Sequence, residues 1–326
     1  MAPTRNPMKI ASPLLLTYLL AVTGAAQQPN AVVSGAPTMG YVFDRAAHSL
    51  RPIWGVPGAA TLGPSLDLGF SVKDASIANE QGYALASDGS AVRLIRWVGG
   101  ISVADIPVVG NAVALFMSPR GTAAGVLTDS PSGTWLGIVT GLSEGSPRVA
   151  GIPLNSQPAA AAVSDDGAYI LTAQQDGTAV VIGQDGTRTL LSAPAPISKV
   201  AFRPGSTDAL VASPDHRVWW IQQALSSAVF TVLATGVDPV GLGFLPDGTH
   251  AVIATARPSV VRTLDVATGA GSSVLCSCDP VQLERMAIPG VFRLTEATGE
   301  PQYLFNAATG ETFFVPAARA NERRVR

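Results

Sequence analysis

The chain has few residues of the types that usually carry chemistry. Its three histidines are His48, His216 and His250, and a metal or acid–base site would need them to converge. The pattern of apolar runs and turns puts His216 in a loop between the second and third strands of a repeat. It puts His48 in a third-to-fourth-strand turn and His250 just after a first-to-second-strand turn, both toward the opposite side. We therefore expect three separate, solvent-facing turn histidines.

The two cysteines, Cys276 and Cys278, are separated by one residue. A redox or metal-binding pair is one interpretation, but a zinc site needs further ligands at suitable spacing. The alternative is an incidental disulfide in a very small ring, or two free thiols at a strand end. One pair of cysteines cannot stabilise a chain of 326 residues through disulfides, so the stability of the fold must come from packing.

Turn geometry explains the other motifs that suggest chemistry. Asp-Gly pairs begin at residues 88, 166, 176, 185 and 247. None lies in the D-x-[DN]-x-[DN]-G pattern of a calcium loop, and hairpin tips favour this dipeptide. Residues 128–135 resemble a sialidase-type Asp box, but the Asp stands at the wrong position. Nucleophile-elbow, phosphate-loop and dinucleotide motifs are absent. We therefore expect no cofactor or metal, and the sequence identifies no catalytic residue.

Two further features have a structural interpretation and a functional one. Trp219 and Trp220 are adjacent in a predicted strand, where successive side chains point to opposite faces. We expect each indole to pack between neighbouring repeats, the alternative being that one lines a binding surface. Residues 318–326 form a basic tail, for which an unstructured terminus is favoured over contact with an anionic surface.

Composition excludes two classes of protein. Apolar residues make up 47% of the chain and charged residues only 13%, which excludes an intrinsically disordered protein. The formal net charge of −2 excludes a nucleic-acid binder that works by bulk charge. With 33 Gly and 25 Pro, the chain must contain many turns.

The first 26 residues are of a different kind. Arg5 and Lys9 precede an apolar run over residues 10–26 that ends in small residues, which is typical of a secretory signal peptide. Pro13 interrupts the run, whose length is marginal for crossing about 30 Å of hydrocarbon. Cleavage after Ala26 is therefore favoured over an uncleaved anchor. We expect a secreted or periplasmic protein without stable membrane insertion after cleavage.

The rest of the chain repeats about every 42 residues. Residues 202–213 (FRPGSTDALVAS) align without gaps with residues 244–255 (FLPDGTHAVIAT). The turns of these two segments lie at residues 206 and 248, and the same turn-then-strand pattern recurs near residues 82, 121, 167 and 290. The six turn positions are therefore separated by 39, 46, 39, 42 and 42 residues. A fixed period with short β-type runs indicates a repeat architecture.

Each repeat continues with a second hairpin. Seven of these can be counted, near residues 41–56, 90–108, 134–150, 178–192, 217–233, 259–275 and 302–315. Only six first hairpins are clear, and a seventh would have to use residues 29–36. Four strands in a repeat of about 42 residues is typical of a β-propeller blade. We predict an all-β propeller over residues 27–317 with seven four-stranded blades, six or eight being the alternatives.

Residues 244–269 and 303–315 resemble the YVTN-type, WD-repeat-like propellers of exported bacterial proteins. The matching elements are the turns Pro246-Asp247-Gly248, Asp265-x-x-Thr268-Gly269 and Asn306-x-x-Thr309-Gly310. The YVTN tetrapeptide itself and a GH…WD signature are absent. The resemblance extends over residues 30–316 and is strongest over 160–316.

The resemblance and the lack of catalytic motifs favour a binding or interaction module. Its ligand would be an unidentified protein or small molecule, held on one face or in the central channel, and we expect a monomer. The alternatives are a lactonase-like hydrolase, which is what the resemblance implies for an enzyme, and a purely structural surface module. A hydrolase would need carboxylates or histidines converging at the channel.

Overall fold

The computed structural model describes residues 37–317. The proposed signal peptide over residues 1–26, the missing first hairpin over 29–36 and the basic tail over 318–326 therefore lie outside the described residues. Among residues 37–317 no helix is both long enough and apolar enough to span a bilayer.

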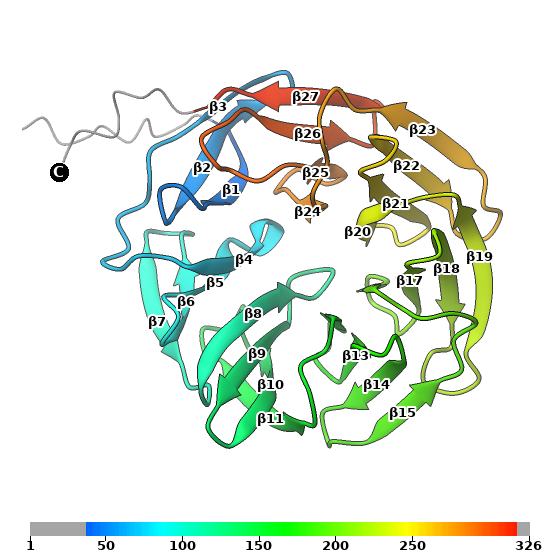
Figure 1. Cartoon of the computed structure of the whole chain (residues 1–326). Helices are drawn as coiled ribbons and strands as arrows, with labels where there is room; N and C mark the ends of the chain where they lie inside the picture. Colours follow the sequence, from blue (N-terminus) through cyan, green and yellow to red (C-terminus); the bar gives the residue numbers. More distant parts are fainter. Residues whose placement is uncertain (1–36, 318–326) are drawn as a thin grey trace, which may run out of the picture. The chain divides into compact units, whose positions relative to one another are not determined.

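The described chain folds into seven antiparallel sheets arranged as the blades of a propeller (Figure 1). Six sheets have four strands and one has three among the described residues. This confirms the predicted all-β, seven-bladed fold. In each blade the strands follow the chain from the centre of the ring to its outer wall (Figure 1).

The blade that comes first along the chain contains β1 (Thr38–Asp44), β2 (Ser49–Val56) and β3 (Ala59–Leu62). The innermost strands of the other six blades are β4 (Asp74–Ala78), β8 (Asn111–Met117), β12 (Ala160–Val163), β16 (Lys199–Phe202), β20 (Pro239–Phe244) and β24 (Glu284–Arg285). Their second strands are β5 (Tyr83–Ser87), β9 (Ala124–Ser130), β13 (Tyr169–Ala173), β17 (Ala209–Ser213), β21 (His250–Thr255) and β25 (Val291–Arg293).

The third strands are β6 (Val92–Arg96), β10 (Gly133–Thr140), β14 (Ala179–Gly183), β18 (Arg217–Gln222), β22 (Val260–Asp265) and β26 (Gln302–Asn306). The outermost strands are β7 (Ser102–Ile106), β11 (Arg148–Leu154), β15 (Arg188–Leu191), β19 (Val229–Thr235), β23 (Gly271–Leu275) and β27 (Glu311–Val315). A 3-10 turn, η1 (Asn79–Gln81), joins β4 to β5.

Antiparallel order places the turns of a blade alternately on the two faces of the ring. We call the face that holds the turns between first and second strands the first-turn face. The opposite face, which holds the turns between second and third strands and the connections between blades, is the second-turn face.

Side-chain oxygens next to glycines form the tight turns that the repeat pattern predicts. Between β22 and β23, Oδ1 of Asp265 accepts hydrogen bonds from the backbone N–H groups of Ala267 (3.1 Å) and Thr268 (2.8 Å). Gly269 then takes a φ of 70°, a left-handed conformation that favours glycine. The Asp-x-x-Thr-Gly pattern is thus explained by the local geometry of the turn.

The core consists of the packed interfaces between neighbouring blades. Trp219 lies between the sheets of the fourth and fifth blades and Trp220 between those of the fifth and sixth, and both are buried. Adjacent strand residues therefore reach two different interfaces, as the sequence predicted. Small residues such as Ala209 and Ala251 complete these clusters and let the sheets approach closely.

The three-stranded blade corrects one sequence prediction. The Met39 carbonyl accepts a hydrogen bond from Ala287, in the turn between β24 and β25 on the first-turn face, at 2.8 Å. At its other end, Asp44 forms a bridge with Ala297, between β25 and β26 on the second-turn face. Strand β1 thus runs in the direction of a second strand, so residues 41–56 form a second-to-third-strand hairpin rather than the last hairpin of a blade.

Candidate functional site

A cavity of about 280 Å³ lies at the centre of the ring. Its walls come from the innermost strands of six blades, and no residue of β1, β2 or β3 lines it. Most of the lining is apolar, with Leu115, Phe116, Val200, Leu242 and Leu283 among the larger side chains. Exposed Arg120 also lines the cavity, so the cavity reaches solvent at the first-turn face.

The charged residues of the cavity lining are Glu80, Arg120, Glu284 and Arg285. Glu284 forms an ion pair with buried Arg293 on the neighbouring strand. Arg285 instead donates from Nη2 to the backbone carbonyl of Phe244, at 2.6 Å, across the gap to the sixth blade. Its Nη1 is buried and has no hydrogen-bond partner among residues 37–317.

Burial lowers the pKa of Arg285. The negative charges of Glu80 and Asp165 act in the opposite direction, while the positive charge of Arg120 adds to the lowering. The guanidinium is thus partly desolvated, and no carboxylate of residues 37–317 forms an ion pair with it.

Hydrogen bonds between successive blades hold the turns around this end of the cavity. Asp165 accepts from the backbone N–H of Arg120 through Oδ1 and from that of Gly205 through Oδ2, both at 2.7 Å. The hydroxyl of Thr122 donates to the backbone carbonyl of Asp165 at 2.5 Å. One carboxylate therefore ties together the first turns of the third, fourth and fifth blades.

The second blade bonds to the third through Tyr83 and Gln81. The phenol of Tyr83 donates to the carbonyl of Gly121, and Nε2 of Gln81 donates to the carbonyl of Arg120 at 3.0 Å. Burial raises the pKa of Tyr83 to about 12, so this phenol remains a hydrogen-bond donor at neutral pH.

The histidines do not converge. His216 lies in the turn between β17 and β18, and His250 begins β21 on the first-turn face, both as predicted. The prediction for His48 is wrong: it belongs to the β1–β2 turn on the second-turn face, because β1 is a second strand. His48 and His216 have φ values of 50° and 66°, a left-handed conformation in which histidine is enriched among non-glycine residues. Turn geometry therefore accounts for both residues.

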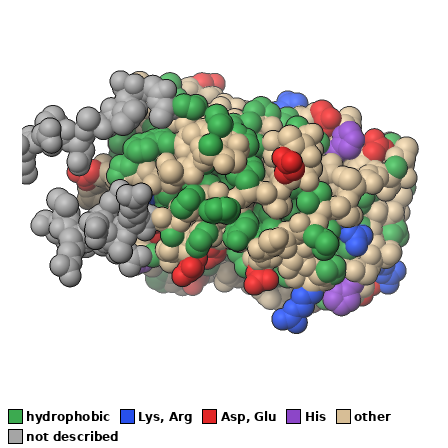
Figure 2. Space-filling model, turned by 90° about the horizontal axis from the view of Figure 1, so that it is seen from above, with side chains coloured by type: hydrophobic (Ala, Val, Ile, Leu, Met, Phe, Trp, Pro, Cys, Tyr) green, Lys and Arg blue, Asp and Glu red, His purple; other side chains and the backbone are tan. Residues whose placement is uncertain are grey.

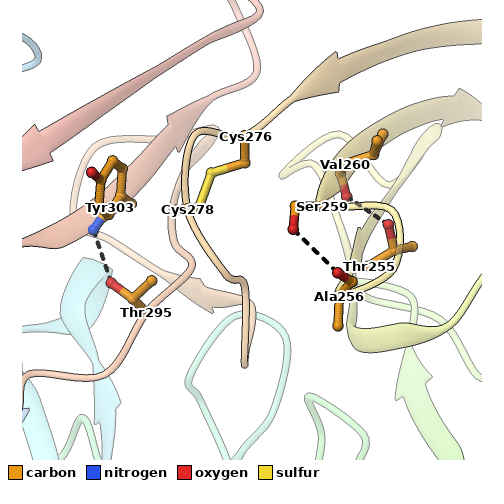
Figure 3. Close-up of a disulfide and its surroundings, with 8 residues drawn as sticks. All are labelled: Thr255, Ala256, Ser259, Val260, Cys276, Cys278, Thr295 and Tyr303. Atoms are coloured by element: carbon orange, nitrogen blue, oxygen red, sulfur yellow. Dashed lines mark hydrogen bonds between the residues drawn. A yellow bond between two sulfur atoms is a disulfide. The ribbon is translucent and has the colours of Figure 1, made fainter.

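Cys276 and Cys278 are joined by a disulfide in the connection from β23 to β24 (Figure 3). It lies between the second-to-third-strand turns of the sixth and seventh blades, near Ser259 and Thr295 (Figure 3). The backbone N–H of Cys276 donates to the carbonyl of Ser259 at 2.9 Å. The bridge is remote from Arg285, which lies toward the opposite face.

The Asp-Gly pairs lie at turns, where Asp oxygens accept local hydrogen bonds. Asp176 and Asp185 each bind the backbone N–H and the hydroxyl of the threonine two residues later. Within residues 37–317, no three side chains of His, Cys, Asp or Glu gather closely enough to hold a metal ion.

The outer wall of the ring carries exposed apolar side chains. Phe314 on β27 and Leu275 at the end of β23 are 59% and 78% exposed. Figure 2 looks onto the outer wall and shows hydrophobic side chains gathered toward one end, with acidic residues among them.

Sequence reasoning did not identify Arg285, Arg120 or Asp165. The last two could have been noticed, because they occupy the recurrent turn segments Pro119-Arg120-Gly121 and Asp165-Asp166-Gly167. For Arg285 the sequence carries no comparable signal, since its segment is the least regular of the repeats. Its setting depends on a contact with Phe244, 41 residues away.

Comparison with known proteins identifies the fold only. No protein-family model and no curated protein matches the chain. A functionally unknown protein from Desulfotomaculum acetoxidans DSM 771 superposes with a TM-score of 0.62 at 14% identity, covering 86% of this chain and 95% of that one. Kuenenia stuttgartiensis hydrazine synthase superposes with a TM-score of 0.53 at 12% identity, covering 90% of this chain and 99% of that one.

Proposed function

We propose that this protein is an exported β-propeller that binds a small-molecule ligand in its central channel. One observation carries the proposal: a cavity of about 280 Å³, apolar along its walls and charged at one end, is enclosed by six blades. Ligand sites in proteins are typically concave and mostly apolar, with a few polar groups that orient the ligand. The bonded turns around the opening keep those polar groups in place.

Export is proposed from two features. Residues 1–26 have the order of a secretory signal peptide, and disulfides such as Cys276–Cys278 persist mainly in oxidising compartments. Membership of the YVTN-type propellers is likewise a proposal, supported by the turns at Pro246-Asp247-Gly248 and Asp265-x-x-Thr268-Gly269.

Binding is preferred over hydrolysis because of the chemistry of the channel lining. The lining contains two carboxylates, Glu80 and Glu284, and one of them is paired with Arg293. Among residues 37–317, the lining contains no histidine, cysteine or tyrosine that would act beside them as a base or nucleophile.

A channel-filling variant tests the proposed site. Ala201→Phe puts a bulky ring on the cavity lining, whereas Ala104→Phe makes the same change at an exposed position on outer strand β7. A library of small molecules is screened by thermal shift against the secreted protein, and each hit is titrated against both variants. Hits that stabilise the wild type and Ala104→Phe but not Ala201→Phe support the channel site. Hits that stabilise all three proteins equally would place binding elsewhere.

A further inference from the structure

We infer that the channel binds a small organic carboxylate with an apolar body, and that Arg285 pairs with the carboxylate group. This inference rests on the proposed channel function and names the ligand class. It follows from the partners of the buried arginines, the chemistry of the walls and the size of the cavity.

Arg285 has no carboxylate partner, unlike Arg51 and Arg293, which are the buried arginines of residues 37–317. Arg96 and Arg262 also have a buried nitrogen without a partner, but Arg285 is the one of these three that lines the cavity. Arg51 pairs with Asp44 at 3.3 Å, and Arg293 pairs with Glu284. No carboxylate of residues 37–317 lies within ion-pair distance of Arg285, and the one hydrogen bond that its side chain makes among these residues is to the Phe244 carbonyl. A guanidinium carries five N–H donors in a planar fork that matches a carboxylate, so this side chain has unused binding capacity.

Leaving that capacity unused is energetically unfavourable. Buried polar groups are normally hydrogen-bonded, and a desolvated charge is stabilised mainly by a direct partner. Nη1 of Arg285 has neither, and burial already lowers the pKa of the group. A ligand anion would supply the missing partner, with a small adjustment of the guanidinium toward the cavity.

The walls determine the rest of the ligand. Leu115, Val200 and Leu242 come from three different blades and offer an apolar surface to the cavity. A volume of about 280 Å³ is at the lower end of the usual range for ligand sites, which fits an aromatic or short aliphatic body. An inorganic phosphate or sulfate would leave these walls without a partner, so a monocarboxylate with an apolar body is the better match.

Matched pairs of ligands isolate the carboxylate. Benzoate and hexanoate are titrated calorimetrically beside benzyl alcohol and hexanol, which have similar apolar bodies and no charge. The proteins are the wild type, Arg285→Met and Arg262→Met. Arg262 is the control because it too has a buried, unpartnered guanidinium nitrogen, on β22 and outside the channel lining.

The expected result is that at least one acid binds the wild type and Arg262→Met with similar Kd. Binding of that acid to Arg285→Met should weaken by about tenfold or more, while the alcohols bind all three proteins weakly and alike. Should Arg285→Met fold poorly, Arg285→Lys keeps the charge but loses the planar fork, and it should bind the acid more weakly than the wild type.

Two results would overturn the inference. An acid and its alcohol that bind the wild type equally, with both lost in Ala201→Phe, would leave the channel function intact and remove the role of the anion. Absence of binding by both acids would also refute it, and the library screen would then decide the channel function separately. Acid binding that survives Ala201→Phe would refute the channel function as well.

Discussion

The side-chain amide of Asn79 binds both backbone groups of Tyr41, at the inner edge of β1 where another blade would have its first strand. Its Oδ1 accepts from the Tyr41 N–H at 2.5 Å, and its Nδ2 donates to the Tyr41 carbonyl at 3.1 Å. The same Nδ2 also donates to the carbonyl of Arg285 at 3.1 Å. One buried side chain of the second blade therefore joins the first and seventh blades.

Replacing this amide should destabilise the protein more than an ordinary polar substitution. Asn79→Ala removes three hydrogen bonds and leaves backbone groups of β1 without partners, which should lower the free energy of unfolding by about 2–4 kcal/mol. Urea unfolding followed by tryptophan fluorescence measures the change. Asn155→Ala, at an exposed position, is the control and should stay within about 0.5 kcal/mol of the wild type. Equal effects of the two substitutions would contradict the bridging role of Asn79.

Asp165 should contribute through the bonds that it makes between blades. Asp165→Asn turns one acceptor oxygen into a donor facing a backbone N–H, at Arg120 or at Gly205, and should cost about 1–2 kcal/mol. The neighbouring Asp166→Asn is the control, because within the described part of the chain Asp166 accepts only from Ser164 and Ala168, in its own turn. Hydrogen exchange should show faster opening of the first turns in Asp165→Asn alone. If the amides of the first turns exchange at the same rate in Asp165→Asn and Asp166→Asn, other contacts hold these turns.

Trp219 and Trp220 should behave as core residues of two different interfaces. Truncation of either to alanine leaves a large cavity between blades and should cost about 3–5 kcal/mol, measured by urea unfolding with circular dichroism. Phe314→Ala removes a 59% exposed ring and serves as the control, with an expected effect within about 0.5 kcal/mol. A small effect at Trp219 or Trp220 would mean that its interface can collapse around the missing ring.

Asp88 should make stability depend on pH in the acidic range. Hydrogen bonds from Arg93 (2.6 Å) and from the N–H groups of Ser90 and Ala91 hold its pKa well below the usual value. Because the folded-state pKa is lower than the unfolded one, the stabilisation is complete above the unfolded value of about 4. It is lost as the pH falls toward the folded-state pKa.

The difference in unfolding midpoint between the wild type and Asp88→Asn should therefore be largest near pH 7 and shrink steadily below about pH 4. Urea titrations at several pH values measure it. Arg93→Gln removes the main partner of the carboxylate and should flatten the same part of the pH profile. A difference that grows on acidification would have the wrong sign for this account.

The period of about 42 residues predicts the class of fold, and the count of seven second hairpins predicts the number of blades. The Pro-Asp-Gly and Asp-x-x-Thr-Gly turns are local, and local geometry is what a single sequence reveals. The direction of β1 was missed because a second-to-third-strand hairpin and a third-to-fourth-strand hairpin look alike in sequence. Which one residues 41–56 form depends on Ala287 and Ala297, which lie more than two hundred residues further along the chain.

The candidate site could not be predicted for a related reason. Its wall is built from about one strand per blade, so no short segment contains a recognisable constellation. The significance of Arg285 depends on a partner that is missing, and a sequence does not show which charges remain unpaired. The histidines and the Asp-Gly pairs can be interpreted as turn residues from the sequence, because a turn depends on residues that are close together in the chain. The left-handed φ values of His48 and His216 agree with that interpretation.

The amide of Asn79 also has a consequence for the order of folding. It touches the carbonyl of Arg285 across a separation of 206 residues, whereas the hairpins within each blade close over a few residues. Contacts of such high contact order form after local ones, because the entropy of closing a long loop must be overcome first. Ring closure is then absent from the folding nucleus, so weakening it should leave the folding rate nearly unchanged and speed unfolding. We therefore expect the kinetic stability of the folded ring to depend on the contacts that Asn79 makes with the first and seventh blades.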